Sequence, residues 1–374
     1  MKIKPLTSLR FFFALMVFLR HSEFIFNHEQ FRSTHNPFFT QLCDRFFSEG
    51  FVGVSFFFML SGFILCLNYK AKLVNNTIGF KEFWVARVAR VYPLHLFTLL
   101  IAIPVSLNGF FAAKAVWFGK LLLNVFLLQS FVPDNEVYFA FNGAAWSISD
   151  EMFFYLLFPF IVMAFFKYGR SFRSALFLLP VLIPIGIYFA PKEWLHHFFY
   201  INPLFRIADF LIGILLYHVY EKINTGNFFR SKVKATVSEI AAIGLFALFV
   251  AFHNEVEQGY RYSCYYWLPI ILVIYVFAQQ TGYISTLLSG KVLVLAGEIS
   301  FSFYLLHQLV FKYIGFINAK LFIIHAEYVL VIIIFIVSLI ASYLCYRFIE
   351  MPANRFVKDK YRSLNTPVPV VSIA

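Results

Sequence analysis

Long apolar runs separated by short polar gaps are the dominant pattern of this chain. Crossing the hydrocarbon core of a bilayer takes about 20 mostly apolar residues in a helix. Ten runs are close to this length, and the pattern predicts transmembrane helices at 8–27, 51–69, 84–107, 150–167, 174–190, 203–220, 237–252, 265–280, 299–318 and 328–349. The apolar run 121–131 is too short and predicts an interfacial or re-entrant helix. The fold class is therefore an all-α polytopic membrane protein.

The basic residues lie mainly in alternate gaps between these runs. With the N-terminus in the cytoplasm, the inside gaps hold more than twice as many lysines and arginines as the outside gaps. The positive-inside rule expects this asymmetry. Both termini are then cytoplasmic, and the two longest loops, 28–50 and 108–149, lie outside. Residues 1–352 form one transmembrane domain, and 353–374 form a short cytoplasmic tail.

Composition narrows the class further. Of 374 residues, 61% are hydrophobic and only 13% are charged, which excludes an ordinary soluble domain. The net charge of +12 does not indicate nucleic-acid binding, because the basic residues sit between apolar runs. No cleavage site of small residues follows the first run, so we expect a retained helix rather than a signal peptide. The four cysteines lack metal-ligand spacing, and Cys43 and Cys264, both in outside loops, are a candidate disulfide.

Ionisable residues inside the predicted spans are the main functional candidates, because they are costly in lipid. Arg10 and His21 lie eleven residues apart, about 16 Å along a helix and on one face. Arg87 and Arg90 share a face at the inner start of the third span, and Glu151 begins the fourth at its outer end. The inner arginines suit a polyanion from the cytoplasm, and the outer His21 and Glu151 suit proton transfer.

Other polar residues recur at helical spacing. Ser147, Glu151 and Tyr155 form one stripe. In the sixth span Arg206 and Asp209 are spaced to pair with each other. The ninth span has a third polar set on one face: Ser300, Tyr304 and His307.

Taken in order, these motifs resemble the acyltransferase-3 family of integral membrane acyltransferases over residues 8–352. The matching segments are Arg10 with His21 after ten residues, GFVGVSFFFMLSGF at 50–63, RVARVYP at 87–93, WSISDE at 146–151 with Phe154-Tyr155, Arg206 with Asp209-Phe210 and Gly213, SFSFYLLH at 300–307, and EMP at 350–352. One position departs from the family pattern: Met152 follows Glu151, where a second acidic residue is common.

The resemblance implies transfer of an acyl group, most often acetyl, from cytoplasmic acyl-CoA as co-substrate. The implied acceptor is a hydroxyl of a cell-surface carbohydrate or lipid-linked glycan, such as O-antigen, exopolysaccharide or peptidoglycan, at a bacterial plasma (inner) membrane. No metal and no nucleic acid is expected. Some members carry a fused soluble hydrolase-like domain. Since this chain stops at residue 374, we expect it to be self-sufficient or to act with a separate soluble acyltransferase or hydrolase-like partner.

His21 is the predicted general base, and a histidine that merely caps its helix is the alternative. A covalent acyl-His21 intermediate stays open. Arg10, Arg87 and Arg90 are predicted to bind the donor phosphates, because arginine binds phosphate in bidentate fashion. For Arg87 and Arg90 the alternative is snorkelling to the inner leaflet.

Glu151 is predicted to orient His21 or to bind an acceptor hydroxyl, with an N-terminal helix cap as the alternative. Tyr92 packs against the adenine or pantetheine of the donor, or is an interfacial aromatic residue. We expect Arg206 and Asp209 to be a structural pair.

The remaining candidates have supporting or substrate-lining roles: Ser61, Trp146, Ser147, Ser149, Tyr155, Tyr304, His307 and Glu350. Among them, Trp146 is expected in the aromatic belt at the membrane surface, and the two serines at 147 and 149 are expected as caps or hydrogen-bond supports. His307 lies on the thioester path or is a core histidine. Glu350 is expected to pair with a basic residue, and Ser61-Gly62 to allow close helix approach.

A transporter or flippase of an acylated donor or a glycan is the alternative function, because buried charges in a helical bundle suit that class too. Two features count against it. The halves show no inverted repeat, and no pair of helices in matching positions is broken by glycine or proline.

Overall fold

The computed structural model describes residues 2–22, 45–167, 170–223, 228–321, 324 and 326–365, and in these ranges the regular structure is helical. The longer helices are α1 (Lys4–His21), α5 (Val52–Val74), α6 (Phe80–Ala102), α8 (Lys114–Val125), α10 (Trp146–Lys167), α11 (Arg170–Phe189), α13 (Pro203–Lys222), α14 (Lys232–Ala251), α16 (Trp267–Ala278), α18 (Lys291–Leu321), α19 (Glu327–Cys345) and α20 (Met351–Asn365). Short helices connect them: α7 (Leu107–Ala112), α9 (Asn135–Tyr138), α12 (Lys192–His196), α15 (Gln258–Arg261) and α17 (Tyr283–Leu288).

Within the described ranges, seven helical segments are long and apolar enough to cross a membrane. They are Val52–Val74, Phe80–Ala102, Gly143–Lys167, Pro203–Lys222, Lys232–Ala251, Lys291–Leu321 and Tyr328–Tyr361. The prediction of a polytopic helical membrane protein is confirmed, and these segments coincide with seven of the ten predicted spans.

The other three predicted spans contain the helices α1, α11 and α16 in their described parts but are not among these seven. Helix α1 carries three charged residues in 18. The apolar parts of α11 and α16 are the short segments Leu178–Phe189 and Cys264–Ala278. The count of ten and the location of the termini therefore remain predictions. The short helix expected around 121–131 is α8, which has 12 residues and ends at Val125.

The closest helix packing joins α5 to α13 and α1 to α18. Glycines at these contacts let the backbones approach each other. A Cβ at Gly62 would lie 2.2 Å from the carbonyl oxygen of Phe210, and one at Gly213 would lie 2.0 Å from that of Met59. These two glycines therefore bring the backbones of α5 and α13 together, as Ser61-Gly62 led us to expect. Aromatic rings fill the neighbouring space, with Phe13 and Phe56 stacked at 3.7 Å between ring centroids.

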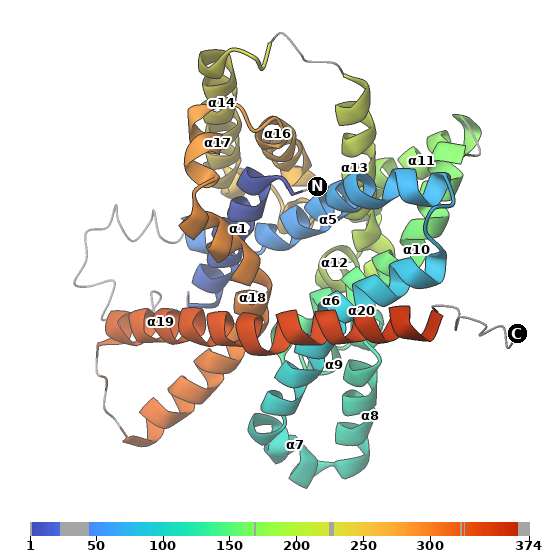
Figure 1. The fold of residues 1–374 in the computed structure, drawn as a ribbon. Helices are drawn as coiled ribbons and strands as arrows, with labels where there is room; N and C mark the ends of the chain where they lie inside the picture. Colours follow the sequence, from blue (N-terminus) through green and yellow to red (C-terminus); the bar gives the residue numbers. More distant parts are fainter. Residues whose placement is uncertain are drawn as a thin grey trace, which may run out of the picture.

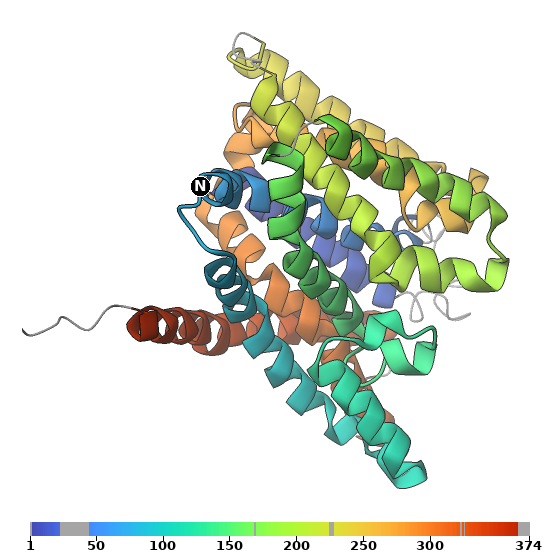
Figure 2. The ribbon, with the colours of Figure 1, turned by 90° about the vertical axis from the view of Figure 1, so that its right-hand side faces the viewer.

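The last two long helices form one continuous rod (Figure 1). A π-helical turn at Tyr346–Glu350 joins α19 to α20, which packs against α6. Residues 353–365 of the predicted tail are therefore helical. In Figure 2, the end of α6 and the pair α7–α8 project away from the remaining helices. Helix α6 lines the cavity described next, and the rod packs against α6.

Candidate active site

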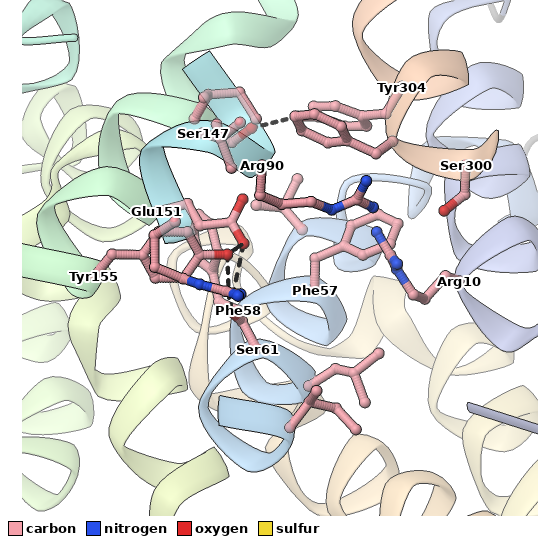
Figure 3. A pocket seen from close by; sticks show the side chains of 17 residues that line it. Arg10, Phe57, Phe58, Ser61, Arg90, Ser147, Glu151, Tyr155, Ser300 and Tyr304 are labelled. Carbon is pink, nitrogen blue, oxygen red and sulfur yellow. Dashed lines mark hydrogen bonds between the residues drawn. The ribbon is translucent and has the colours of Figure 1, made fainter. Parts of the chain in front are cut away.

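A cavity of about 240 Å³ lies where α1, α5, α6, α10 and α18 meet (Figure 3). Its polar lining residues are Arg10, Ser61, Arg87, Arg90, Ser147, Glu151, Tyr155, Ser300 and Tyr304. Apolar side chains such as Phe57 and Phe58 complete the wall. The structure thus brings the three predicted donor-binding arginines into one cavity, although Arg10 comes from α1 and the other two from α6.

Two of these arginines are held by neighbouring side chains. Arg87 donates from Nη2 to the hydroxyl of Tyr69 at 2.7 Å. Arg90 forms an ion pair with Glu350, whose carboxylate also accepts a hydrogen bond from Ser302 Oγ at 2.8 Å. Glu350 therefore has the basic partner that we predicted. The π-helical turn that ends at Glu350 places this carboxylate, only 2% exposed, against the cavity wall.

Arg10 has a different environment. Among the residues that the structure describes, it makes no hydrogen bond and no ion pair. Figure 3 shows the guanidinium groups of Arg10 and Arg90 pointing into the same space. Like charges that share a cavity of low dielectric repel each other, so this arrangement favours a bound anion. Because Glu350 already neutralises Arg90, and Glu151 is the one carboxylate in the described lining, the cavity keeps an excess of positive charge.

Glu151 lies with the arginines, and its oxygens face α5 and its own helix. It accepts hydrogen bonds from Ser61 Oγ at 3.3 Å and from the hydroxyl of Tyr155. The predicted stripe on α10 is thus real, and it lines the cavity. The described contacts of Glu151 do not include His21, which is held by other residues. The expected separation into inner arginines and an outer His21–Glu151 pair is therefore not what the structure shows.

His21, at the end of α1, contacts two side chains of α18. Its Nδ1 lies 2.9 Å from Nε2 of His307, and its Nε2 lies 2.7 Å from the side-chain nitrogen of Gln308. The sequence alone leaves the role of His307 open and gives no reason to single out Gln308. The one signal in the sequence was their position at the end of the SFSFYLLH segment. Because His21 and His307 are 286 residues apart, this contact depends on how α1 and α18 pack.

Tyr304 connects this histidine pair to the cavity. Its hydroxyl lies 2.8 Å from Ser147 Oγ, which lines the cavity with it. Its ring centroid is 5.9 Å from that of His307, one helical turn further along α18. His21 is not one of the 17 lining residues. The site therefore has two parts: an arginine cavity, and a histidine pair that follows it along α1 and α18.

Several candidates have structural contacts. Tyr92 donates its hydroxyl to the carbonyl of Val125 at 2.8 Å and so ties α6 to the end of α8. Trp146 is 3% exposed and packs on Tyr200 at 4.8 Å between ring centroids. The belt position predicted for Trp146 is therefore wrong, because the helix start that it occupies is buried against η4 (His197–Ile201) rather than facing lipid.

The remaining predicted residues also have internal partners. Ser149 Oγ donates to the carbonyl of Leu127 at 2.5 Å and accepts from Ser130 Oγ at 2.7 Å, as expected of a hydrogen-bond support. Arg206 and Asp209 form a buried ion pair at 2.9 Å, the structural pair that we predicted.

Within the described ranges, no cluster of histidine, cysteine and acidic side chains could hold a metal ion. Cys43, one half of the candidate disulfide, lies outside the described residues. No solved structure matches this chain.

Comparison with known sequences agrees with the motifs. Residues 4–347 match the model of the acyltransferase domain of the acyltransferase-3 family. Acyltransferase MdmB of Streptomyces mycarofaciens is 30% identical in an alignment of 330 positions that covers 83% of this chain and 80% of that protein. O-acetyltransferase OatA of Staphylococcus aureus (strain NCTC 8325) is 25% identical in an alignment of 335 positions that covers 83% of this chain and 54% of that protein. A putative O-acetyltransferase of S. aureus (strain COL), SACOL0978, is 25% identical in an alignment of 356 positions that covers 86% of this chain and 55% of that protein.

The chain thus spans about half the length of these staphylococcal relatives and most of the Streptomyces protein. The family match covers all five helices that build the arginine cavity and the histidine pair. Seven described segments can cross a membrane. The chain therefore belongs to the acyltransferase-3 family and is an integral membrane acyltransferase.

Proposed function

We propose that this enzyme transfers an acetyl group from cytoplasmic acetyl-CoA to a hydroxyl of a cell-surface carbohydrate or lipid-linked glycan, in the plasma membrane of a bacterium. The observation that carries the proposal is the cavity with three arginines, one of which shares helix α1 with His21. The O-acetyltransferase names of two relatives support acetyl as the acyl group. A separate soluble partner that passes the group to the acceptor is compatible with this site.

The charge of the cavity supports a phosphorylated donor. Coenzyme A carries several phosphate groups, and guanidinium groups bind phosphate through paired hydrogen bonds. Arg10 makes no hydrogen bond or ion pair among the described residues, and Arg90, paired with Glu350, has further guanidinium N–H groups to offer a phosphate. At about 240 Å³ the cavity is smaller than the roughly 300–1,000 Å³ of a pocket for a whole drug-sized ligand. It would therefore hold only part of the donor, and the thioester arm would extend along α1 toward the histidine pair.

His21 supplies the base in this proposal. Its Nε2 takes the proton of the acceptor hydroxyl while that oxygen attacks the thioester carbonyl. The carbon–sulfur bond then breaks, and the leaving thiolate takes the proton from the imidazolium. Arg10 and His21 are about 16 Å apart along α1, which separates the phosphate end of the donor from its reactive end.

Acceptor-dependent release of free coenzyme A tests the function. The purified protein in proteoliposomes would receive acetyl-CoA and a mixed pool of bacterial glycans. Free thiol would be measured over time, and the acetylated product by mass spectrometry. We expect thiol release that requires the glycan. Transport of donor or glycan across the bilayer with the thioester intact would instead establish the transporter alternative.

Replacing Arg10 by glutamine should raise the KM for acetyl-CoA about 10- to 100-fold, with a smaller change in kcat. A hydrogen bond to a charged group contributes about 1.5–3 kcal/mol, and about 1.4 kcal/mol corresponds to a factor of ten. Steady-state kinetics with varied acetyl-CoA measures this change. The matched control is Lys114→Gln, which removes an exposed charge from α8 outside the cavity. Equal KM values for the two variants would remove Arg10 from the donor site.

A further inference from the structure

We propose that His307 is a positioning residue that sets the tautomer of His21, so that the Nε2 lone pair of His21 is available to the acceptor hydroxyl. This inference rests on the proposed function and adds a residue to its mechanism. A row of contacts runs from the backbone of α18 through His307 to His21. Nδ1 of His307 lies 3.2 Å from the carbonyl oxygen of Phe303, and Nε2 of His307 lies 2.9 Å from Nδ1 of His21.

The carbonyl of Phe303 determines which nitrogen donates in each of these hydrogen bonds. A carbonyl oxygen only accepts hydrogen bonds, so Nδ1 of His307 must carry the hydrogen of that contact. In a neutral imidazole the other nitrogen is then an acceptor. Nε2 of His307 therefore accepts from Nδ1–H of His21. The same rule leaves Nε2 of His21 without a hydrogen, and the side-chain amide of Gln308 donates to it at 2.7 Å.

The surroundings of His307 favour the neutral form that this direction requires. His307 is fully buried, with 0% of its surface exposed. Its ring is stacked on that of Phe303 at 6.1 Å between centroids, and the ring of Phe18 lies 6.2 Å away. An imidazolium among aromatic rings with no carboxylate among its described hydrogen-bond partners would be costly.

During the reaction this arrangement holds one proton in place while another moves. The acceptor hydroxyl replaces Gln308 at Nε2 of His21, its O–H bond breaks, and an N–H bond forms at Nε2. The Nδ1–H of the resulting imidazolium stays hydrogen-bonded to His307. His21 also hydrogen-bonds to the backbone of Val17, one turn back on α1. We expect that contact alone not to hold the ring, so that without His307 the ring rotates or carries its proton on Nε2, where it cannot take the hydroxyl proton. In serine proteases an aspartate holds the catalytic histidine in this way.

Two substitutions at His307 separate positioning from packing. His307→Gln keeps an acceptor atom near the position of Nε2, and His307→Phe keeps the ring but removes the acceptor. We expect His307→Phe to lower kcat by a factor of about 10²–10⁴, with the KM for acetyl-CoA within about threefold of wild type. His307→Gln should retain kcat within about tenfold. His95→Phe is the control, because His95 is equally buried and contacts the carbonyl of Asn124 outside the cavity.

The tautomer itself can be measured without turnover. In protein labelled with ¹⁵N-histidine, the signals of His21 are those lost in His21→Asn. We expect a hydrogen on Nδ1 in wild type and in His307→Gln, and on Nε2 or exchanging in His307→Phe. A hydrogen on Nε2 in wild type would overturn the inference. So would equal loss of kcat in folded His307→Gln and His307→Phe, or wild-type kcat in His307→Phe. Absence of thiol release from wild type would overturn the proposed function instead, because the NMR result does not depend on it.

Discussion

Replacing His21 by alanine is expected to reduce acceptor-dependent release of coenzyme A by a factor of about 10²–10⁴, the usual contribution of a positioned general base. Binding of acetyl-CoA should change only a few-fold, because His21 lies outside the arginine cavity and contacts His307 and Gln308 instead. The measurements are the initial rate of thiol release at saturating donor and the Kd of acetyl-CoA from a direct binding assay.

The control for this prediction is His196→Ala on α12. His196 contacts the hydroxyl of Tyr138 at 3.2 Å and is not among the lining residues of the cavity. This variant should keep the wild-type rate. If His21→Ala keeps the wild-type rate as well, His21 is not the base. If instead it binds donor a hundredfold more weakly, its role is in donor binding, and the base must be sought on α18, which contacts His21.

The second large effect concerns stability. Asp209→Ala should lower the free energy of unfolding by about 3–5 kcal/mol, because it leaves the guanidinium of Arg206 buried without its counter-ion. Arg206 is 1% exposed, and its other hydrogen-bond partners are neutral: Ser55 Oγ at 3.0 Å and the carbonyl of Tyr262 at 2.5 Å. Asp209 also accepts from Trp267, so its removal leaves that indole N–H without its acceptor. Reversible unfolding in mixed detergent micelles measures the change.

Two further variants test whether the loss of stability comes from leaving a buried charge unpaired. The double variant Arg206→Met/Asp209→Leu removes both charges and should recover most of the lost stability, since a buried ion pair contributes little compared with apolar packing. Glu136→Ala breaks the exposed pair of Lys120 and Glu136, which lie 3.0 Å apart, and should cost about 0–1 kcal/mol. A double variant no more stable than Asp209→Ala would show that the pair stabilises the fold through its hydrogen bonds rather than by cancelling charge.

The arginine cavity depends both on residue spacing within one helix and on packing between helices. Arg87 and Arg90 share a face of α6 because they are three residues apart, which is visible in the sequence. Their meeting with Arg10 depends on the packing of α1, α5, α6, α10 and α18. So does the choice of partner for Arg90, since the ion pair with Glu350 joins α6 to the end of the rod formed by α19 and α20.

Properties set within one helix were determined by the sequence alone. The apolar runs predicted helices, because the period and length of a membrane helix are local. The position of Arg10 and His21 on one helix, and of Glu151 and Tyr155 one turn apart, followed from the same period. Close approach at Gly62 was also foreseeable, since a small residue in a span is typical of a helix contact.

Contacts between helices were decided only by the tertiary structure. His21 contacts His307 rather than Glu151, and Trp146 is buried rather than in the membrane belt. In both cases the partner lies on another element, brought near by the crossing of helices. Periodicity specifies which face of a helix is polar, but it does not specify which helix that face meets. His21 and His307 both belong to the family motifs, and the packing of α1 on α18 decides that they touch.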